Sequence, residues 1–109
     1  MLSEEFEIAG TAGDGEAMIQ AVEVLNPDVV LADIAMPRLD GIEASRRILS
    51  SRSEMPIVLL TVHREPEFVQ QALAIGILGY VDKLTAGEDV IPAIRSVLQG
   101  EVFVSRTCL

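Results

Sequence analysis

The 109-residue chain lacks several features that define other classes of protein. It has no tryptophan and one tyrosine, so aliphatic side chains must supply most of its core. Its single cysteine, Cys108, excludes an internal disulfide and suits a reducing cytosol, and we interpret it as a thiol of the C-terminal tail. No apolar run approaches the roughly 18 residues of a membrane span, and no signal peptide opens the chain. We therefore predict a soluble, cytoplasmic protein.

Basic residues are also scarce, since 8 Lys and Arg stand against 17 Asp and Glu, and the formal net charge is -9. Phosphate groups repel so acidic a chain, and we expect this segment to make no direct contact with nucleic acid or with an anionic membrane. Half of the residues are hydrophobic. A chain of this length buries roughly two-thirds of its unfolded surface, which favours one packed domain.

Apolar runs alternate with segments of helical periodicity, which predicts an α/β fold with a parallel sheet covered by helices. The expected strands are residues 6–10, 29–33, 57–61 and 79–83. The expected helices lie between Asp14 and Asn26, over residues 41–51, between Pro66 and Gly76, and between Thr85 and Gly100. Asp14 is a suitable N-cap, and Thr85 and Glu88 have the spacing of a capping box.

Three of the expected strands end in residues suited to phosphoryl chemistry, namely Asp33, Thr61 and Lys83. The carboxyl ends of parallel strands meet at one edge of a sheet, where ligands collect. An Asp carboxylate is a competent nucleophile toward phosphorus. Lys83 can offset the repulsion between that carboxylate and the phosphoryl oxygens, and the Thr61 hydroxyl can donate to one of them.

In this order the motifs resemble the receiver domain of bacterial two-component response regulators, most closely those with a LuxR-type output domain. The matching segments are residues 33–41, 59–62 and 76–83, with an exit at 100–105, and the resemblance covers essentially the whole chain. It implies a flavodoxin-like, doubly wound sheet of strand order 2-1-3-4-5. Nothing matches the first strand, its acidic pair or most of the first helix. We therefore expect an N-terminally truncated receiver over residues 1–100, and over 101–109 the start of a linker to an absent output domain.

The resemblance also implies roles for individual residues. A histidine kinase would transfer a phosphoryl group to Asp33 and so control an output, which the resemblance implies to be transcription. Thr61 would move toward the phosphate while Tyr80 turns inward, and Lys83 would bind it. Mg²⁺ would be held by the acidic pair, by Asp33 and by the backbone carbonyl of Ala35. Without the acidic pair that site is incomplete, so we expect slow or undetectable labelling of this chain.

Each of these residues also has a purely structural interpretation. Thr61 could satisfy a local backbone group, Lys83 could be solvated, and Tyr80 could be half-buried with its hydroxyl in water. His63 is expected to be a solvated loop residue, and Asp40 a cap of the following helix.

Other functions stay open beside this signalling module, which we expect not to be an enzyme. A phosphorylation-deficient receiver, acting only through protein contacts, fits the missing acidic pair. A phosphohydrolase with an Asp nucleophile would need a second Asp where Ala35 stands. A flavodoxin-like electron carrier would need a phosphate-binding loop early in the chain and aromatic residues around its flavin. A homo-oligomer through the exposed strand edge or the last helices is also expected.

Overall fold

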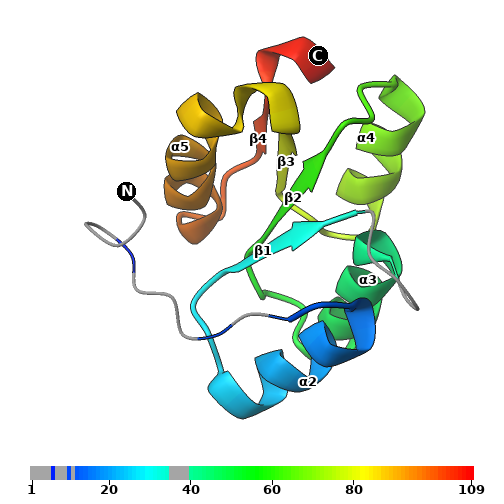
Figure 1. Ribbon diagram of the computed structural model, residues 1–109, viewed down its shortest axis with the longest axis vertical. Helices are drawn as coiled ribbons and strands as arrows, with labels where there is room; N and C mark the ends of the chain where they lie inside the picture. The colour runs from blue at the N-terminus through cyan, green and yellow to red at the C-terminus, as the bar shows by residue number, and fades with distance from the viewer. Residues whose placement is uncertain (1–5, 7–9, 11, 35–39) are drawn as a thin grey trace.

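The computed structural model describes residues 6, 10, 12–34 and 40–109 (Figure 1). Within this part of the chain the sheet has four strands in the order β1-β2-β3-β4. Every neighbouring pair is parallel. The strands are β1 (Val30–Asp33), β2 (Ile57–Thr61), β3 (Gly79–Asp82) and β4 (Phe103–Val104). The predicted α/β class with a parallel sheet is confirmed.

Helices cover both faces of this sheet. Figure 1 shows α5 on one face and the other three helices on the opposite side. Their bounds are α2 (Gly15–Leu25), α3 (Gly41–Ser51), α4 (Pro66–Ala74) and α5 (Ala86–Leu98), with short 3-10 turns η1 (Lys83–Thr85) and η2 (Arg106–Cys108). No helix within the described residues is long and apolar enough to cross a membrane.

Side chains alternate between two apolar clusters because successive strand residues point to opposite faces. On one face, Ile57, Leu59 and Tyr80 join buried residues of α2, α3 and α4. On the other face, Val58 and Val81 pack against buried residues of α5. Both clusters are rich in aliphatic side chains, as the composition predicts.

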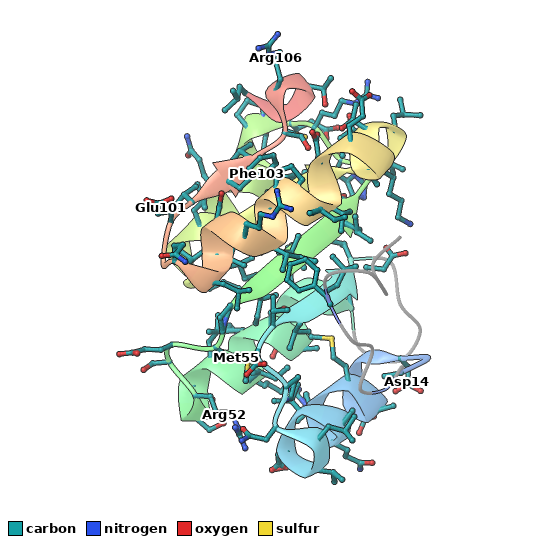
Figure 2. The ribbon with its side chains drawn as sticks, turned by 90° about the vertical axis from the view of Figure 1, so that its left-hand side faces the viewer. Asp14, Arg52, Met55, Glu101, Phe103 and Arg106 are labelled. Atoms are coloured by element: carbon teal, nitrogen blue, oxygen red, sulfur yellow. The ribbon has the colours of Figure 1, made fainter. Side chains whose placement is uncertain are left out.

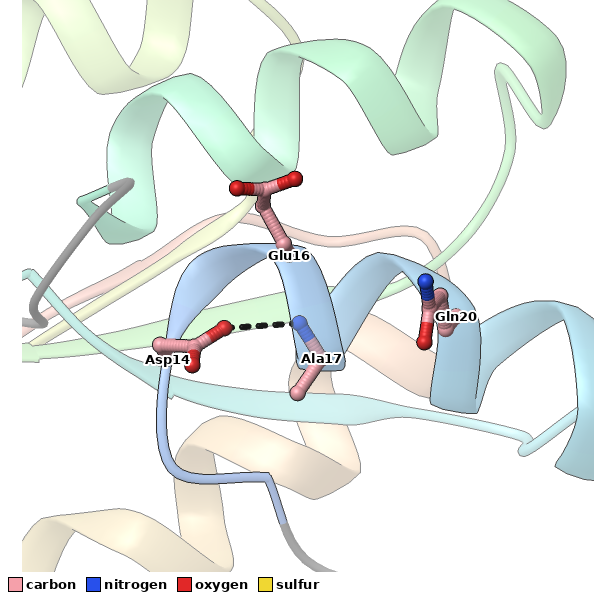
Figure 3. A pocket seen from close by; sticks show the side chains of 4 residues that line it. All are labelled: Asp14, Glu16, Ala17 and Gln20. Atoms are coloured by element: carbon pink, nitrogen blue, oxygen red, sulfur yellow. Dashed lines mark hydrogen bonds between the residues drawn. The ribbon is translucent and has the colours of Figure 1, made fainter.

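Local capping explains several helix ends. The Asp14 carboxylate accepts a 2.8 Å hydrogen bond from the Ala17 N–H, which confirms the predicted N-cap of α2 (Figure 3). Asn26 ends that helix in the left-handed conformation, at φ 47°. The capping box predicted at Thr85 is wrong, because its hydroxyl makes no cap bond. It donates instead to Asp89 Oδ2, at 2.6 Å.

The N-terminal strand predicted over residues 6–10 falls mostly outside the described residues, because 7–9 are not described. Phe6 and Gly10 belong to no strand, and Phe6 packs against the apolar cluster on the α5 face. The strands predicted at 29–33, 57–61 and 79–83 lie side by side in that order. This arrangement is the 3-4-5 part of the strand order implied by the resemblance.

The segment predicted as the start of a linker packs against the domain. Phe103–Val104 forms β4 beside β3, and Figure 2 shows Phe103 next to α5. Cys108, predicted as a thiol of the tail, is only 4% exposed and joins the core on the α2–α4 face. Burial raises the pKa of this thiol. The further role of residues 101–109 as a linker stays a prediction.

Candidate functional site

Three neighbouring strands deliver the predicted site residues to one edge of the sheet. Asp33 ends β1 opposite Leu60 of β2, and Thr61 ends β2 opposite Asp82 of β3. Lys83 follows β3 directly, in the turn η1. The structure therefore brings Asp33, Thr61 and Lys83 to the carboxyl edge, where parallel α/β sheets bind their ligands.

Asp33 and Lys83 form an ion pair across 50 positions of sequence. Lys83 Nζ donates to Asp33 Oδ2 at 2.6 Å, and the two side chains are 38% and 37% exposed. Exposed pairs of this kind contribute only about 0–1 kcal/mol to stability. Stability is thus a poor explanation for the pair, whereas a cation on a carboxylate is what phosphoryl transfer to that carboxylate requires.

The backbone around Asp33 is fixed by a close approach of α3. The Gly41 N–H donates to the Ile34 carbonyl at 2.9 Å. A Cβ on Gly41 would lie 2.3 Å from the carbonyl oxygen of Asp33, so only glycine fits at this contact. Asp40 caps α3, as predicted, by accepting from the Glu43 N–H at 2.8 Å. Ala35, predicted to offer its carbonyl to a metal, lies outside the described residues.

Tyr80 and Thr61 meet beneath the loop that follows β2. Tyr80 is fully buried, and its hydroxyl donates to the His63 carbonyl at 2.8 Å. Thr61 Oγ1 accepts from the His63 N–H at 2.9 Å. Burial raises the pKa of Tyr80, and a hydrogen bond with Thr61 acts in the opposite direction. The structural interpretation of Tyr80 as half-buried with its hydroxyl in water is therefore wrong.

His63 is held more firmly than a solvated loop residue. Its ring stacks on Phe68 with the ring centroids 4.6 Å apart, and its side chain is partly buried. Both of its backbone polar groups are used, one by Thr61 and one by Tyr80. The backbone of one loop residue, His63, is therefore bonded to both predicted switch residues, Thr61 and Tyr80.

Asp82 is a polar centre that the sequence analysis missed. It is fully buried, and Oδ2 accepts from Arg64 Nε at 2.7 Å and from the Thr107 hydroxyl at 2.6 Å. Oδ1 accepts from the Leu84 N–H at 2.9 Å. The Thr107 hydroxyl, the Leu84 N–H and Arg64 hold the pKa of this carboxyl below its ordinary value of 3.8. The sequence signal that could have identified Asp82 is an acidic residue inside a predicted strand, residues 79–83.

The depressed pKa of Asp82 predicts a specific acid sensitivity. A carboxyl whose pKa is lower in the folded state stabilises the fold above its unfolded pKa, and this contribution is lost as the pH falls through the folded value. Below pH 3.8 we therefore expect the wild type to lose more stability than Asp82→Asn, relative to each protein at neutral pH. Urea midpoints at the two pH values measure the difference. Equal losses in both proteins would contradict the assignment to Asp82.

Only one ligand of the predicted magnesium site, Asp33, lies within the described residues. Among them, no three His, Cys, Asp or Glu side chains come together as a metal-binding group. Asp33 is the one predicted carboxylate ligand that the structure describes, and it contacts the Lys83 ammonium. Mg²⁺ is commonly held by one or two carboxylates with phosphate oxygens and water. Asp33 can supply one such carboxylate, so the described residues alone would hold the ion only weakly.

Known proteins share this arrangement. Residues 1–95 match the family described as the response regulator receiver domain. The transcriptional regulatory protein DegU of Brevibacillus brevis is 34% identical over 100 residues, which is 92% of this chain and 42% of that protein. A LuxR-family two-component response regulator from Aurantimonas sp. SI85-9A1 superposes with a TM-score of 0.90 at 27% identity, over 94% of this chain and 74% of that one.

A third likeness concerns a complex with ligands. A chain of the CheX–CheY–BeF3–Mg²⁺ complex from Borrelia burgdorferi matches with a TM-score of 0.81 at 28% identity, covering 87% of this chain and 72% of the matched chain. The present chain spans about half the length of the curated relatives that it matches. The family match covers most of the chain, and the parallel sheet with its covering helices agrees with it. This chain belongs to the receiver domain family of two-component response regulators.

Proposed function

We propose that this chain is a phosphoacceptor module, in which Asp33 takes a phosphoryl group from a histidine kinase and thereby controls an output such as transcription. The observation that supports it most is the Lys83–Asp33 pair at the carboxyl edge of the sheet. Matched relatives are named as regulators rather than enzymes, in line with a signalling role.

The transfer itself is a nucleophilic displacement at phosphorus. An oxygen of the Asp33 carboxylate forms the new O–P bond while the P–N bond of the kinase phosphohistidine breaks, and the imidazole leaves with the bonding electron pair. Lys83 already contacts Oδ2 and can move to a phosphoryl oxygen, which limits the repulsion between the two anions. The Thr61 hydroxyl, one strand away, can donate to a second phosphoryl oxygen.

Magnesium is part of the proposal because the Borrelia burgdorferi complex contains both Mg²⁺ and BeF3. When bound, the ion would neutralise charge on the phosphoryl oxygens. Asp33 would be one ligand, and the carbonyl of Ala35 is proposed as another. Because Asp33 is the one predicted carboxylate ligand among the described residues, Mg²⁺ affinity is expected to be weak.

Intact-mass measurement tests the proposed function. We incubate the chain with acetyl phosphate and Mg²⁺, beside a known receiver domain as a positive control. Addition of one phosphoryl group, removed by hydroxylamine as an acyl phosphate should be, supports Asp33 phosphorylation. Labelling is expected to be slow, so the incubation is prolonged. No addition even then, under conditions in which the control is labelled, favours the phosphorylation-deficient receiver instead. The observation behind this second candidate is that no three His, Cys, Asp or Glu side chains of the described residues form a metal-binding group.

A homo-oligomer through the edge of β1 is a further proposal. Among the described residues, β1 pairs only with β2, and Leu31 in β1 is 38% exposed. Unpaired strand edges attract other strands. We expect light scattering at micromolar concentration to give a mass above the 11.8 kDa of one chain. A monomer that melts cooperatively would contradict this expectation.

The net charge of -9 argues against direct contact between this segment and nucleic acid. A sequence-specific gel shift at physiological salt would oppose that proposal. The cytoplasmic location also stays a prediction.

A further inference from the structure

Hydrogen bonds join the C-terminal segment, residues 103–109, to the strand end that carries Lys83. The Phe103 N–H donates to the Leu78 carbonyl and the Ser105 N–H to the Tyr80 carbonyl, each at 2.9 Å. The Ser105 hydroxyl accepts from the Asp82 N–H at 3.0 Å and donates to Asp89 Oδ2 at 2.7 Å. Ser105 itself is fully buried. The segment is therefore bonded along the whole of β3, not only at its start.

Thr107 extends this contact beyond the strands. Its hydroxyl donates to Asp82 Oδ2 at 2.6 Å, although the residue as a whole is exposed. The same oxygen accepts from Arg64. One buried carboxylate oxygen thus holds together the C-terminal segment and the loop that follows β2.

Asp82 also sets the position of Lys83. Its Oδ1 accepts from the Leu84 N–H, which caps η1, the turn that contains Lys83. From this turn Lys83 reaches Asp33 on β1. A change in the orientation of the Asp82 carboxylate would therefore change the turn, and with it the placement of the ammonium group on Asp33.

Through Arg64, the Asp82 carboxylate is also connected to the loop that follows β2. Arg64 lies next to His63, whose backbone bonds to Thr61 and to Tyr80. Removing one donor from Asp82 would leave a buried charged oxygen with fewer partners, a condition that proteins relieve by rearranging nearby groups. Arg64 and η1 are the groups that can rearrange.

We propose that the C-terminal segment positions the phosphoacceptor site, with Thr107 acting through Asp82 to hold Lys83 against Asp33 and to hold the loop of His63 and Arg64. Thr107 is a positioning residue, since its hydroxyl bonds to Asp82 and acts on Lys83 through that carboxylate. If Asp33 is the phosphoacceptor, as proposed above, phosphorylation of Asp33 and the anchoring of residues 105–109 are coupled. This consequence rests on the proposed function. Such coupling is reciprocal by thermodynamic necessity.

A simpler interpretation is that Thr107 only pins the end of the chain. Both interpretations predict looser structure at residues 105–109 when the hydroxyl is removed. They differ at the Leu84 and His63 amides, which belong to η1 and to the loop after β2. Only the positioning role predicts a change there.

Amide hydrogen exchange of Thr107→Val, followed by NMR, makes this distinction. Thr107→Val keeps the side-chain shape and removes the hydroxyl. We expect exchange at Leu84 and His63 to become roughly 2–10-fold faster, as the loss of one hydrogen bond implies. Thr107→Ser, which restores the hydroxyl, should return both rates toward wild type. Ser50→Ala, which removes an exposed hydroxyl bonded to the Arg47 carbonyl, is the matched control and should leave them unchanged.

The result that overturns the proposal is faster exchange confined to residues 105–109, with Leu84 and His63 unaffected. A second measurement adds beryllofluoride and Mg²⁺, whose BeF3 group mimics phosphate in a matched receiver structure. We expect it to change exchange at Cys108 and Leu109 in the wild type, and this change to be lost in Thr107→Val. Binding without any such change also overturns the coupling. Failure of beryllofluoride to bind counts against the proposed function, whereas the Thr107→Val rates still decide the positioning role.

Discussion

We expect the replacement of Asp33 by asparagine to abolish phosphoryl incorporation from acetyl phosphate under any conditions in which the wild type is labelled. The amide lacks the anionic oxygen that attacks phosphorus, and no other described carboxylate contacts Lys83 at this edge of the sheet. Intact mass with and without hydroxylamine measures the effect. Labelling that persists in Asp33→Asn would place the phosphoacceptor at another residue.

Asp40→Asn is the matched control, because it makes the same chemical change seven positions along. Asp40 is exposed and caps α3 through its side chain. Asparagine is about as good an N-cap as aspartate, so α3 should be retained. Labelling is expected to survive in Asp40→Asn.

The loss in Asp33→Asn is expected without unfolding. The Asp33–Lys83 pair is more than one-third exposed on both sides, and such pairs contribute only about 0–1 kcal/mol. Urea midpoints of Asp33→Asn and the wild type should therefore lie close together. A large drop in the urea midpoint of Asp33→Asn would mean that the variant loses labelling because it is destabilised, and not because it lacks the attacking oxygen.

The features that the sequence predicted correctly are those set by local chemistry. Helix starts at Asp14 and Asp40 follow from side chains that bond to amides three residues away. The strands follow from short apolar runs. Asp33, Thr61 and Lys83 met at one edge because parallel strands share their carboxyl ends, so topology alone was sufficient to bring these residues together.

The features that were missed depend on partners distant in sequence. The capping box at Thr85 had the right spacing. The Thr85 hydroxyl instead donates to the Asp89 carboxylate, which also accepts from the Ser105 hydroxyl. The Tyr80 hydroxyl can be buried because it donates a hydrogen bond to the His63 carbonyl, 17 residues away. No local pattern encodes such a choice.

The C-terminal segment was missed for a related reason. Phe103–Val104 is too short to stand out as a strand, and its pairing with β3 becomes evident only once α5 returns the chain to that edge. Cys108 then enters the core because the segment is held against the sheet. The donors that surround Asp82 come from positions as far as 25 residues away.

Gly41→Ala is expected to destabilise the protein and to displace the end of β1. A Cβ at this position would lie 2.3 Å from the Asp33 carbonyl oxygen and 2.9 Å from its carbonyl carbon, so it meets backbone and not a flexible side chain. Overpacking of this kind costs about 1–3 kcal/mol or more. The gain in helix propensity from Gly to Ala is at most about 1 kcal/mol. The clash is the larger effect, and relieving it means moving α3 or Asp33.

Gly87→Ala makes the same change near the start of α5, where a Cβ would meet nothing within 4 Å. Here the propensity gain acts alone, and we expect stabilisation of up to about 1 kcal/mol. Urea denaturation of both variants measures this opposite pair of shifts, and the displaced Asp33 should also reduce labelling in Gly41→Ala but not in Gly87→Ala. A urea midpoint for Gly41→Ala at or above that of the wild type would show that the backbone accommodates the added methyl group without loss of stability. The close approach of α3 would then not be what fixes Asp33.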